Sequence, residues 1–265
     1  MLEPIAPELW GHSQVLRLPG GVIFHARMTV LRLPSGALVL HSPVSIDDAL
    51  ATALAELGPV RHLVTPNAMH DGFAAAGRAR YPEAVLWAPP AFRNASGSSD
   101  NPKVPADRWL DDPAVEDAFE SVIAVHEIAG APKISEFVFR HRPTASLIVS
   151  DLLFHIDYPT NWITRLVLRM VGAHGGRLAQ SRAWRMATRD RAAAGRSIEP
   201  VFDADGRAAA PDEARCVRRL IPGHGSVLTA DPGREAEFEA SILNALWWMR
   251  GRVKGDATRA LASAS

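Results

Sequence analysis

The feature of this sequence that most constrains its fold is an alternation of short apolar runs with helix-like segments between residues 37 and 88. The runs at 37–41, 60–64 and 84–88 are rich in branched and apolar residues and are bounded by turn formers, as buried strands are. The first intervening segment begins with Ser45 as a cap and ends at Gly58, and the second runs to about Arg80. Strands that alternate with helices predict an α/β sheet.

The remaining elements follow from the same patterns. Residues 21–33 are apolar and β-branched, and a turn at 34–36 joins them to the next run as an antiparallel hairpin. Residues 89–114 are rich in Pro, Ser, Asn and Asp, which predicts a long loop. Further strands are expected at 121–125, 136–139 and 146–149, and helices at 162–170, 178–195, 213–219 and 234–250.

Length and composition limit the class of protein. The chain has 265 residues, of which 47% are hydrophobic, so we expect one domain over residues 1–255 and a disordered small-residue tail over 256–265. Lys plus Arg and Asp plus Glu number 29 each, a balance that gives no electrostatic argument for nucleic acid or an anionic membrane. The single Cys216 rules out an internal disulfide. No signal-peptide pattern and no long apolar run is present, so we expect a cytoplasmic protein without a membrane span.

Three polar residues, His70, Asp151 and His224, each stand just after a predicted strand. His224 lies in Pro222-Gly-His-Gly225, where the flanking glycines let backbone or ligand approach the imidazole closely. Ligands of α/β proteins bind beyond strand ends, and two histidines with one carboxylate can hold one divalent metal ion. Taken singly, each residue is better explained as a cap or turn residue. The metal interpretation therefore requires the three loops to converge.

Several short motifs resemble those of the metallo-β-lactamase superfamily, and most closely an uncharacterised branch of it. These motifs are Arg27-Met-Thr, Leu40-His-Ser-Pro43, the segment from Asn67 to His70, and Leu147-Ile-Val-Ser-Asp-Leu-Leu153. The resemblance covers roughly residues 20–230. It implies an α/β (α+β) fold, a four-layer αββα sandwich in which two mixed sheets lie face to face with helices outside. It also implies a metal site at one edge of the sandwich.

The metal ligands of the superfamily are only partly present. The resemblance retains three of the four ligands of the second metal ion: His70, Asp151 and His224. The lost ligands, including all three histidines of the first metal ion, map to Thr65, Asn67, Met69 and Ala131. The resemblance thus implies either a single-metal protein or a scaffold that no longer binds metal. A shift of one residue in the loop alignment would bring Asp71 near the site in place of Met69.

Five further polar residues are candidates for outer partners of the metal or for contacts to substrate: His41, Asn67, Asp71, Glu136 and His155. His41 is a candidate fourth ligand or outer partner, although a satisfied buried histidine explains it better. Asn67 can supply an amide, and Glu136 a supporting or acid–base carboxylate. His155 follows Asp151 by four residues, so it either reaches the same edge or faces solvent.

These observations leave two functions open. In the first, the protein is a metal-dependent hydrolase with one Zn²⁺ or Fe²⁺ and with Asp151 as catalytic residue. Water activated by the metal would attack an ester, thioester, lactone or phosphoester. The loop 89–114 and the helix 162–170 would shape its substrate pocket. In the second, a non-catalytic protein of the same fold binds a small molecule or a protein partner. Metal content distinguishes the two.

Overall fold

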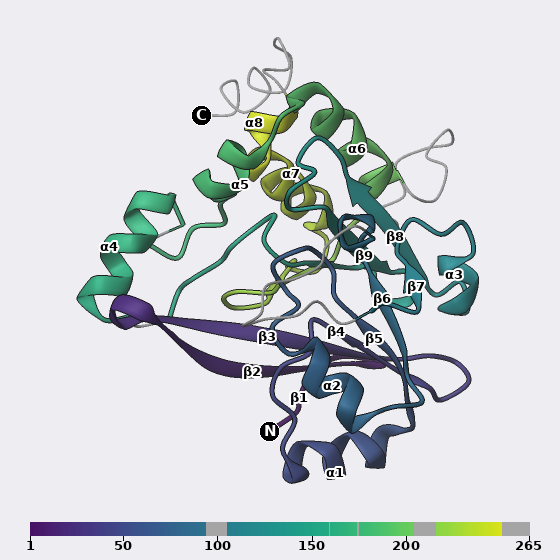
Figure 1. The fold of residues 1–265 in the computed structure, drawn as a ribbon. Helices are drawn as coiled ribbons and strands as arrows, with labels where there is room; N and C mark the ends of the chain where they lie inside the picture. Colours follow the sequence, from purple (N-terminus) through teal and green to yellow (C-terminus); the bar gives the residue numbers. More distant parts are fainter. Residues whose placement is uncertain (94–104, 159, 174, 204–215, 251–265) are drawn as a thin grey trace.

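The computed structural model describes residues 1–93, 105–158, 160–173, 175–203 and 216–250. Two β-sheets lie face to face, and helices cover the outer side of each sheet (Figure 1). This arrangement is the four-layer αββα sandwich that the resemblance implied, and that expectation is confirmed.

The larger sheet has seven strands in the order β1-β2-β3-β4-β5-β6-β7. Its first four strands pair antiparallel, and β4 to β7 pair parallel. The strands are β1 (Glu3–Ala6), β2 (Leu9–Leu18), β3 (Val22–Arg32), β4 (Leu38–His41), β5 (Val60–Val64), β6 (Val85–Ala88) and β7 (Arg108–Trp109). The crossover helices α1 (Asp48–Leu57) and α2 (Ala74–Arg80) connect the parallel strands. The predicted alternation and the predicted hairpin are therefore confirmed.

The smaller sheet has five strands in the order β12-β11-β10-β9-β8. They are β8 (Ile123–Ile128), β9 (Glu136–His141), β10 (Ser146–Val149), β11 (Arg219–Pro222) and β12 (Leu228–Thr229). Only β10 and β11 pair parallel, with Val149 opposite Pro222. The remaining helices are α3 (Val115–Ala118), α4 (Trp162–Val171), α5 (Arg182–Ala187), α6 (Arg191–Asp203), α7 (Glu235–Ala245) and α8 (Trp247–Arg250). Three short 3₁₀ turns complete the described elements: η1 (Pro19–Gly21), η2 (Pro90–Phe92) and η3 (Arg142–Thr144).

Three hydrophobic layers hold the sandwich together. The central layer packs Leu31 and Val39 of the larger sheet with Phe139 and Ile148 of the smaller sheet. One outer layer lies between the larger sheet and α1, and the other joins the smaller sheet to α5, α6, α7 and α8. Burial of this apolar area supplies the main driving force for the fold. The layers also fix both sheets rigidly, so that the loops at one edge are held in place.

The first twenty residues depart from the sequence expectation. We expected strands from residue 21 onward, whereas β1 and β2 already extend the larger sheet before that point. β2 is a long strand that pairs with β3 from Leu9 opposite Leu31 to Leu18 opposite Val22. Most of its side chains are at least partly exposed, so its sequence lacks the apolar run that marks a buried strand.

Helix boundaries also differ from those expected. Asp47, and not Ser45, caps α1, because its side chain accepts a hydrogen bond from Leu50 N at 2.8 Å. The helix expected over 178–195 is divided into α5 and α6, and the one over 234–250 is divided at Leu246. For the helix expected over 213–219, residues 213–215 lie outside the described residues, and Arg219 begins a strand.

Two other expectations fall on parts that the structure does not describe. The tail at 256–265 and residues 94–104 of the predicted loop lie outside the described residues. The described parts of that loop contain η2 and the short strand β7. No helix among the described residues is long and apolar enough to cross a bilayer.

Candidate metal centre

Three loops from both sheets converge at one edge of the sandwich. Asp151 follows β10 and His224 follows β11, and the parallel pairing of these strands carries the two residues to the same edge. His70 lies in the turn between β5 and α2. Gly223 permits the close approach, because a Cβ atom there would lie 3.1 Å from His70 Cε1 and 3.2 Å from Ser150 Cα. The convergence that the metal interpretation required is therefore present.

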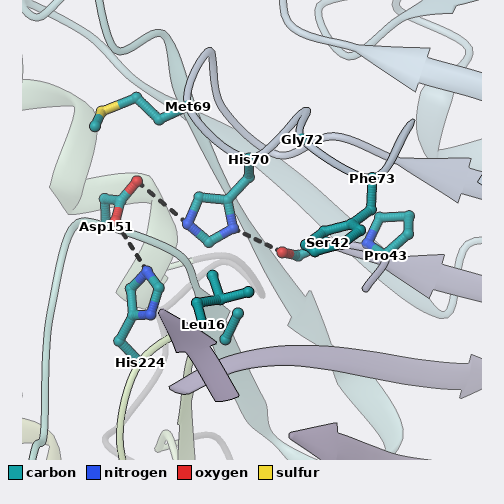
Figure 2. A pocket seen from close by; sticks show the side chains of 10 residues that line it. Leu16, Ser42, Pro43, Met69, His70, Gly72, Phe73, Asp151 and His224 are labelled. Carbon is teal, nitrogen blue, oxygen red and sulfur yellow. Dashed lines mark hydrogen bonds and ion pairs between the residues drawn. The ribbon is translucent and has the colours of Figure 1, made fainter. Parts of the chain in front are cut away.

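Asp151 lies between the two imidazoles (Figure 2). Its Oδ2 is 3.3 Å from His70 Nε2, and its Oδ1 is 3.5 Å from His224 Nε2. One ligand atom from each of the three residues can be chosen so that all lie within 4.8 Å of one another. Two imidazole nitrogens and a carboxylate at this spacing are a donor set that fits one divalent ion with coordination positions left open.

The opposite ring nitrogens of both histidines contact other groups. His224 Nδ1 donates to the carbonyl oxygen of His25 at 2.8 Å, and His70 Nδ1 lies 2.6 Å from Ser42 Oγ. An imidazole whose Nδ1 donates a proton presents the lone pair of Nε2, which is the arrangement that metal-binding histidines show. Both Nε2 atoms face Asp151. The His25 carbonyl requires the proton of His224 on Nδ1, which suits metal binding through Nε2, whereas the Ser42 hydroxyl can either accept from His70 Nδ1 or donate to it.

Asn67 connects two of the three residues. Its Nδ2 donates to Asp151 Oδ2 at 2.8 Å, while its Oδ1 accepts from the backbone N–H groups of Met69 and His70 at 2.8 and 2.9 Å. The side chain is fully buried, so these bonds are shielded from water. Asn67 thus links the Asp151 carboxylate to the backbone of the turn that carries His70.

Glu136 holds the loop that carries Asp151. Its Oε1 accepts from the backbone N–H groups of Ser150, Asp151 and Leu152 at 2.9–3.0 Å, and its Oε2 accepts from Trp184 Nε1 at 3.0 Å. Burial and the nearby Asp151 carboxylate raise the pKa of Glu136 to about 8, whereas these donors favour the ionised form. The side chain therefore supports the loop that carries Asp151.

The charged groups of the cluster shift one another's pKa. Burial disfavours the charged form of Asp151, but the adjacent His70 and His224 hold the pKa of Asp151 well below its usual range. Burial also opposes protonation of His224, yet Asp151 raises the pKa of His224 overall. Asp151 is half-buried, and its carboxylate carries the negative charge of the cluster. A divalent cation would compensate this negative charge.

The other predicted neighbours lie outside the donor cluster. His41 is buried and its Nε2 has no hydrogen-bond partner among the described residues, while its ring packs edge-on against Phe139. His155 is bound to the His224 loop: its Nδ1 lies 3.2 Å from Ser226 O, and its backbone N–H donates to His224 O. Asp71 is not among the residues grouped around the site.

The positions of the lost family ligands have other roles in this structure. Thr65 is buried and its hydroxyl donates to Trp87 O at 3.1 Å. Ala131 belongs to the core under α6, and the side chain of Met69 is 66% exposed. Neither Thr65 nor Ala131 therefore offers a strong ligand at the site.

A cavity of about 180 Å³ opens onto the cluster. Apart from His70, Asp151 and His224, its walls are Leu16, Ala26, Ser42, Pro43, Met69, Gly72 and Phe73 (Figure 2). The walls come from β2, β3, the end of β4 and the turn before α2. Neither the described parts of the loop 89–114 nor α4 lines this cavity, contrary to our expectation. Sequence reasoning also missed the contact of Ser42 with His70, although Ser42 stands in the Leu40-His-Ser-Pro43 motif.

The sandwich and the cluster at its edge define a protein of the metallo-β-lactamase fold, and solved structures confirm the fold. The DIM-1 metallo-β-lactamase exposed to ceftazidime is 12% identical, with a TM-score of 0.58 over 93% of this chain and 96% of that chain. FIM-1 from Pseudomonas aeruginosa in its mono-zinc form is 14% identical, with a TM-score of 0.57 over 95% of this chain and 96% of that chain. A metallo-β-lactamase from Erythrobacter litoralis with β-mercaptoethanol in its active site is 17% identical, with a TM-score of 0.57 over 92% and 95%.

Within this fold the chain belongs to the family described as Domain of unknown function (DUF4336), whose sequence profile matches residues 7–182. That match includes His70 and Asp151 and ends before His224. The comparison with curated proteins found no match. The solved structures share too little sequence identity with this chain to show more than its fold.

Proposed function

We propose that this protein is a hydrolase that uses a single divalent metal ion held by His70, Asp151 and His224. The observation that carries the proposal is the convergence of two Nε2 atoms on one carboxylate, with the Nδ1 atoms engaged by His25 O and Ser42 Oγ. When bound, a divalent ion lowers the pKa of coordinated water and polarises a carbonyl oxygen. Two imidazoles and one carboxylate suit zinc or iron.

Asp151 has two tasks in this proposal. Its Oδ2 is held by Asn67 Nδ2, which fixes the orientation of the carboxylate. Its Oδ1 lies 3.5 Å from His224 Nε2, so this oxygen would ligate the metal ion, and the two histidines keep the carboxylate ionised for that role by lowering its pKa. Asp151 is therefore our candidate for both ligand and catalytic residue.

The cavity supports a small and uncharged substrate. Its walls outside the donor cluster carry no charged side chain, so nothing in them would compensate an anionic phosphoester. Its volume of about 180 Å³ is below the roughly 300–1,000 Å³ of pockets that hold drug-sized ligands. Apolar walls beside a metal site favour an ester, thioester or lactone with a short acyl group. We place this activity in the cytoplasm.

A panel of short-chain esters, thioesters and lactones tests the proposal. We expect hydrolysis that stops on chelation, returns with added Zn²⁺ or Fe²⁺, and falls at least about a hundredfold in Asp151→Asn. His155→Ala is the matched control, because His155 borders the site without belonging to the donor cluster. Metal binding without turnover of any substrate would instead favour a non-catalytic protein that binds a small molecule or a protein partner.

A further inference from the structure

The charge balance of the whole chain hides a strongly basic segment. Between Asp157 and Asp190 the sequence contains six arginines and no acidic residue. The arginines are Arg165, Arg169, Arg177, Arg182, Arg185 and Arg189. None of them forms an ion pair among the described residues. The segment includes α4 and α5, so its positive charge belongs to one region of the fold.

Helix α4 exposes an apolar stripe within this basic segment. It buries Thr164 and Leu168 against the molecule, whereas Trp162, Leu166 and Met170 are 69%, 51% and 58% exposed. These three side chains are four residues apart, so they lie along one side of the helix. Large apolar side chains aligned on the surface mark an interaction face.

Arginines border the stripe. Arg165 and Arg169 are exposed and each immediately precedes a residue of the stripe. Arg182 is also exposed, and its Nη1 donates to the carbonyl oxygen of Met170 at 3.3 Å. On α5, Met186 is 81% exposed. The face therefore combines apolar side chains, a tryptophan among them, with guanidinium groups that form no ion pair in the part of the chain that the structure describes.

The position of α4 suits contact with an extended surface. It lies at the outside of the molecule beside the β2–β3 hairpin (Figure 1). Asn161 Nδ2 donates to Gly21 O at 2.8 Å, and Thr164 Oγ1 accepts from Ile23 N at 2.8 Å, so the helix is fixed to the hairpin tip. Near that tip β2 exposes Val15 and Leu18. These apolar groups would extend the contact beyond the helix.

We propose that the α4 face docks on the surface of an anionic lipid bilayer. A helix with aromatic and apolar residues on one side and arginines beside them lies in the headgroup region, where the apolar side chains insert and the guanidinium groups meet lipid phosphates. A second copy of this chain is a poorer partner, because a symmetric contact through α4 would bring like charges together.

Sedimentation with vesicles tests the proposal. We expect the full chain to bind vesicles with about one third phosphatidylserine, to bind phosphatidylcholine vesicles weakly, and to lose binding in about 1 M salt. Arg165→Gln/Arg169→Gln should weaken binding by about 25-fold, because each arginine near an anionic surface contributes about a factor of five. Trp162→Ser/Met170→Ser should weaken it at least as much.

The matched control is Arg61→Gln/Arg108→Gln, which removes two exposed arginines from β5 and β7, away from α4. This variant should bind as the unaltered protein does, and circular dichroism checks that every variant folds. Absence of binding to anionic vesicles, or equal binding by the α4 variants, would overturn the proposal. The proposal would also be overturned if the protein were a dimer in solution and Trp162→Ser/Met170→Ser separated the dimer without changing vesicle binding. Protein treated with a chelator to remove metal should bind vesicles as the untreated protein does, so the vesicle test does not depend on the hydrolase proposal.

Discussion

Asn67 shows at the scale of a single residue how the candidate site is organised. It replaces a residue that binds metal in the superfamily, according to the resemblance, and it now donates to Asp151 Oδ2 and accepts from Met69 N and His70 N. One buried amide thus positions two of the three proposed ligands.

We predict that Asn67→Ala lowers metal affinity by about tenfold to a hundredfold, the usual loss when an outer partner of a ligand is removed. It also removes the acceptor of the Met69 and His70 backbone N–H groups, which lowers the unfolding free energy by about 1–3 kcal/mol. Calorimetric titration with Zn²⁺ measures the first effect and urea unfolding the second. Asn161→Ala is the control, since Asn161 caps α4. It should lower stability by about 1 kcal/mol and leave metal affinity unchanged. Unchanged affinity in Asn67→Ala would contradict the account.

His41 gives a prediction for pH dependence. Burial, together with the neighbouring His70, lowers the pKa of His41 from 6.5 to about 3. Between these values the unfolded chain binds a proton that the folded protein does not. The contribution of His41 to the unfolding free energy is therefore constant above pH 6.5. Below pH 6.5 the unfolding free energy falls by about 1.4 kcal/mol per pH unit. Urea unfolding of the metal-free protein from pH 7 to pH 5 should show this slope, and His41→Leu should reduce it. An equal dependence of the unfolding free energy on pH in both proteins would contradict the low pKa of His41.

The three proposed ligands could be selected from the sequence because each one follows a predicted strand. Their supporting contacts could not be found in the same way. Asn67 and Asp151 are separated by 84 positions, and Ser42 and His70 by 28. Such contacts depend on the packing of two sheets, which no local pattern encodes. For the same reason Glu136 could be named as a candidate, but not as the acceptor of three backbone N–H groups.

At the scale of elements, the turn after β11 is the most constrained part of the site. Gly225 has a φ of 104°, and a Cβ atom at this position would lie 1.8 Å from His155 O. Only glycine fits here, so the second glycine of Pro222-Gly-His-Gly225 is required by backbone contact as well as by conformation.

We predict that Gly225→Ala lowers the unfolding free energy by more than about 3 kcal/mol and displaces His224 from the cluster. Gly233→Ala is the matched control, because Gly233 has a φ of 78° and no atom lies within 4 Å of an added Cβ. Gly233→Ala should lower the unfolding free energy by only about 1–2 kcal/mol, because alanine is strained in the left-handed conformation. Urea unfolding compares the two, and similar losses would show that the His155 contact is unimportant.

The turn before α2 allows the cavity to be narrowed without a clash. Gly72 lines the cavity, and no atom lies within 4 Å of a Cβ added there. The series Gly72→Ala, Gly72→Val and Gly72→Leu should leave metal content unchanged and progressively raise KM for longer acyl groups, while acetyl esters are affected least. A rise in KM that is independent of acyl length would indicate that the substrate does not enter this cavity.

Elements were predictable where the pattern was strong. The alternation between residues 37 and 88 indicated β4, β5 and β6 correctly, because buried parallel strands are short apolar runs. β2 was missed because most of its side chains are at least partly exposed. The pattern of α4 predicted a helix but not that Trp162, Leu166 and Met170 would face outward. The helix packs on the hairpin through Thr164, a contact set by tertiary structure.

At the scale of the whole molecule, the sandwich brings loops from two sheets to a single edge. The larger sheet carries the turn with His70, and the smaller sheet carries Asp151 and His224. The four-layer fold was implied by family resemblance, and the alternation of strands and helices alone would have indicated only an α/β protein. Composition also concealed the charge asymmetry, because a net charge of zero averages the basic α4–α5 segment with acidic residues elsewhere.

The most direct test of the central claim is the metal content of untagged protein, measured by mass spectrometry beside a His70→Ala/His224→Ala double variant. The account predicts about one equivalent of zinc or iron in the unaltered protein and almost none in the variant, since one donor set of three residues binds one ion. Two equivalents would show that the ligand set is incomplete. No bound metal, even after addition of Zn²⁺ or Fe²⁺, would contradict the metal centre and the hydrolase proposal with it.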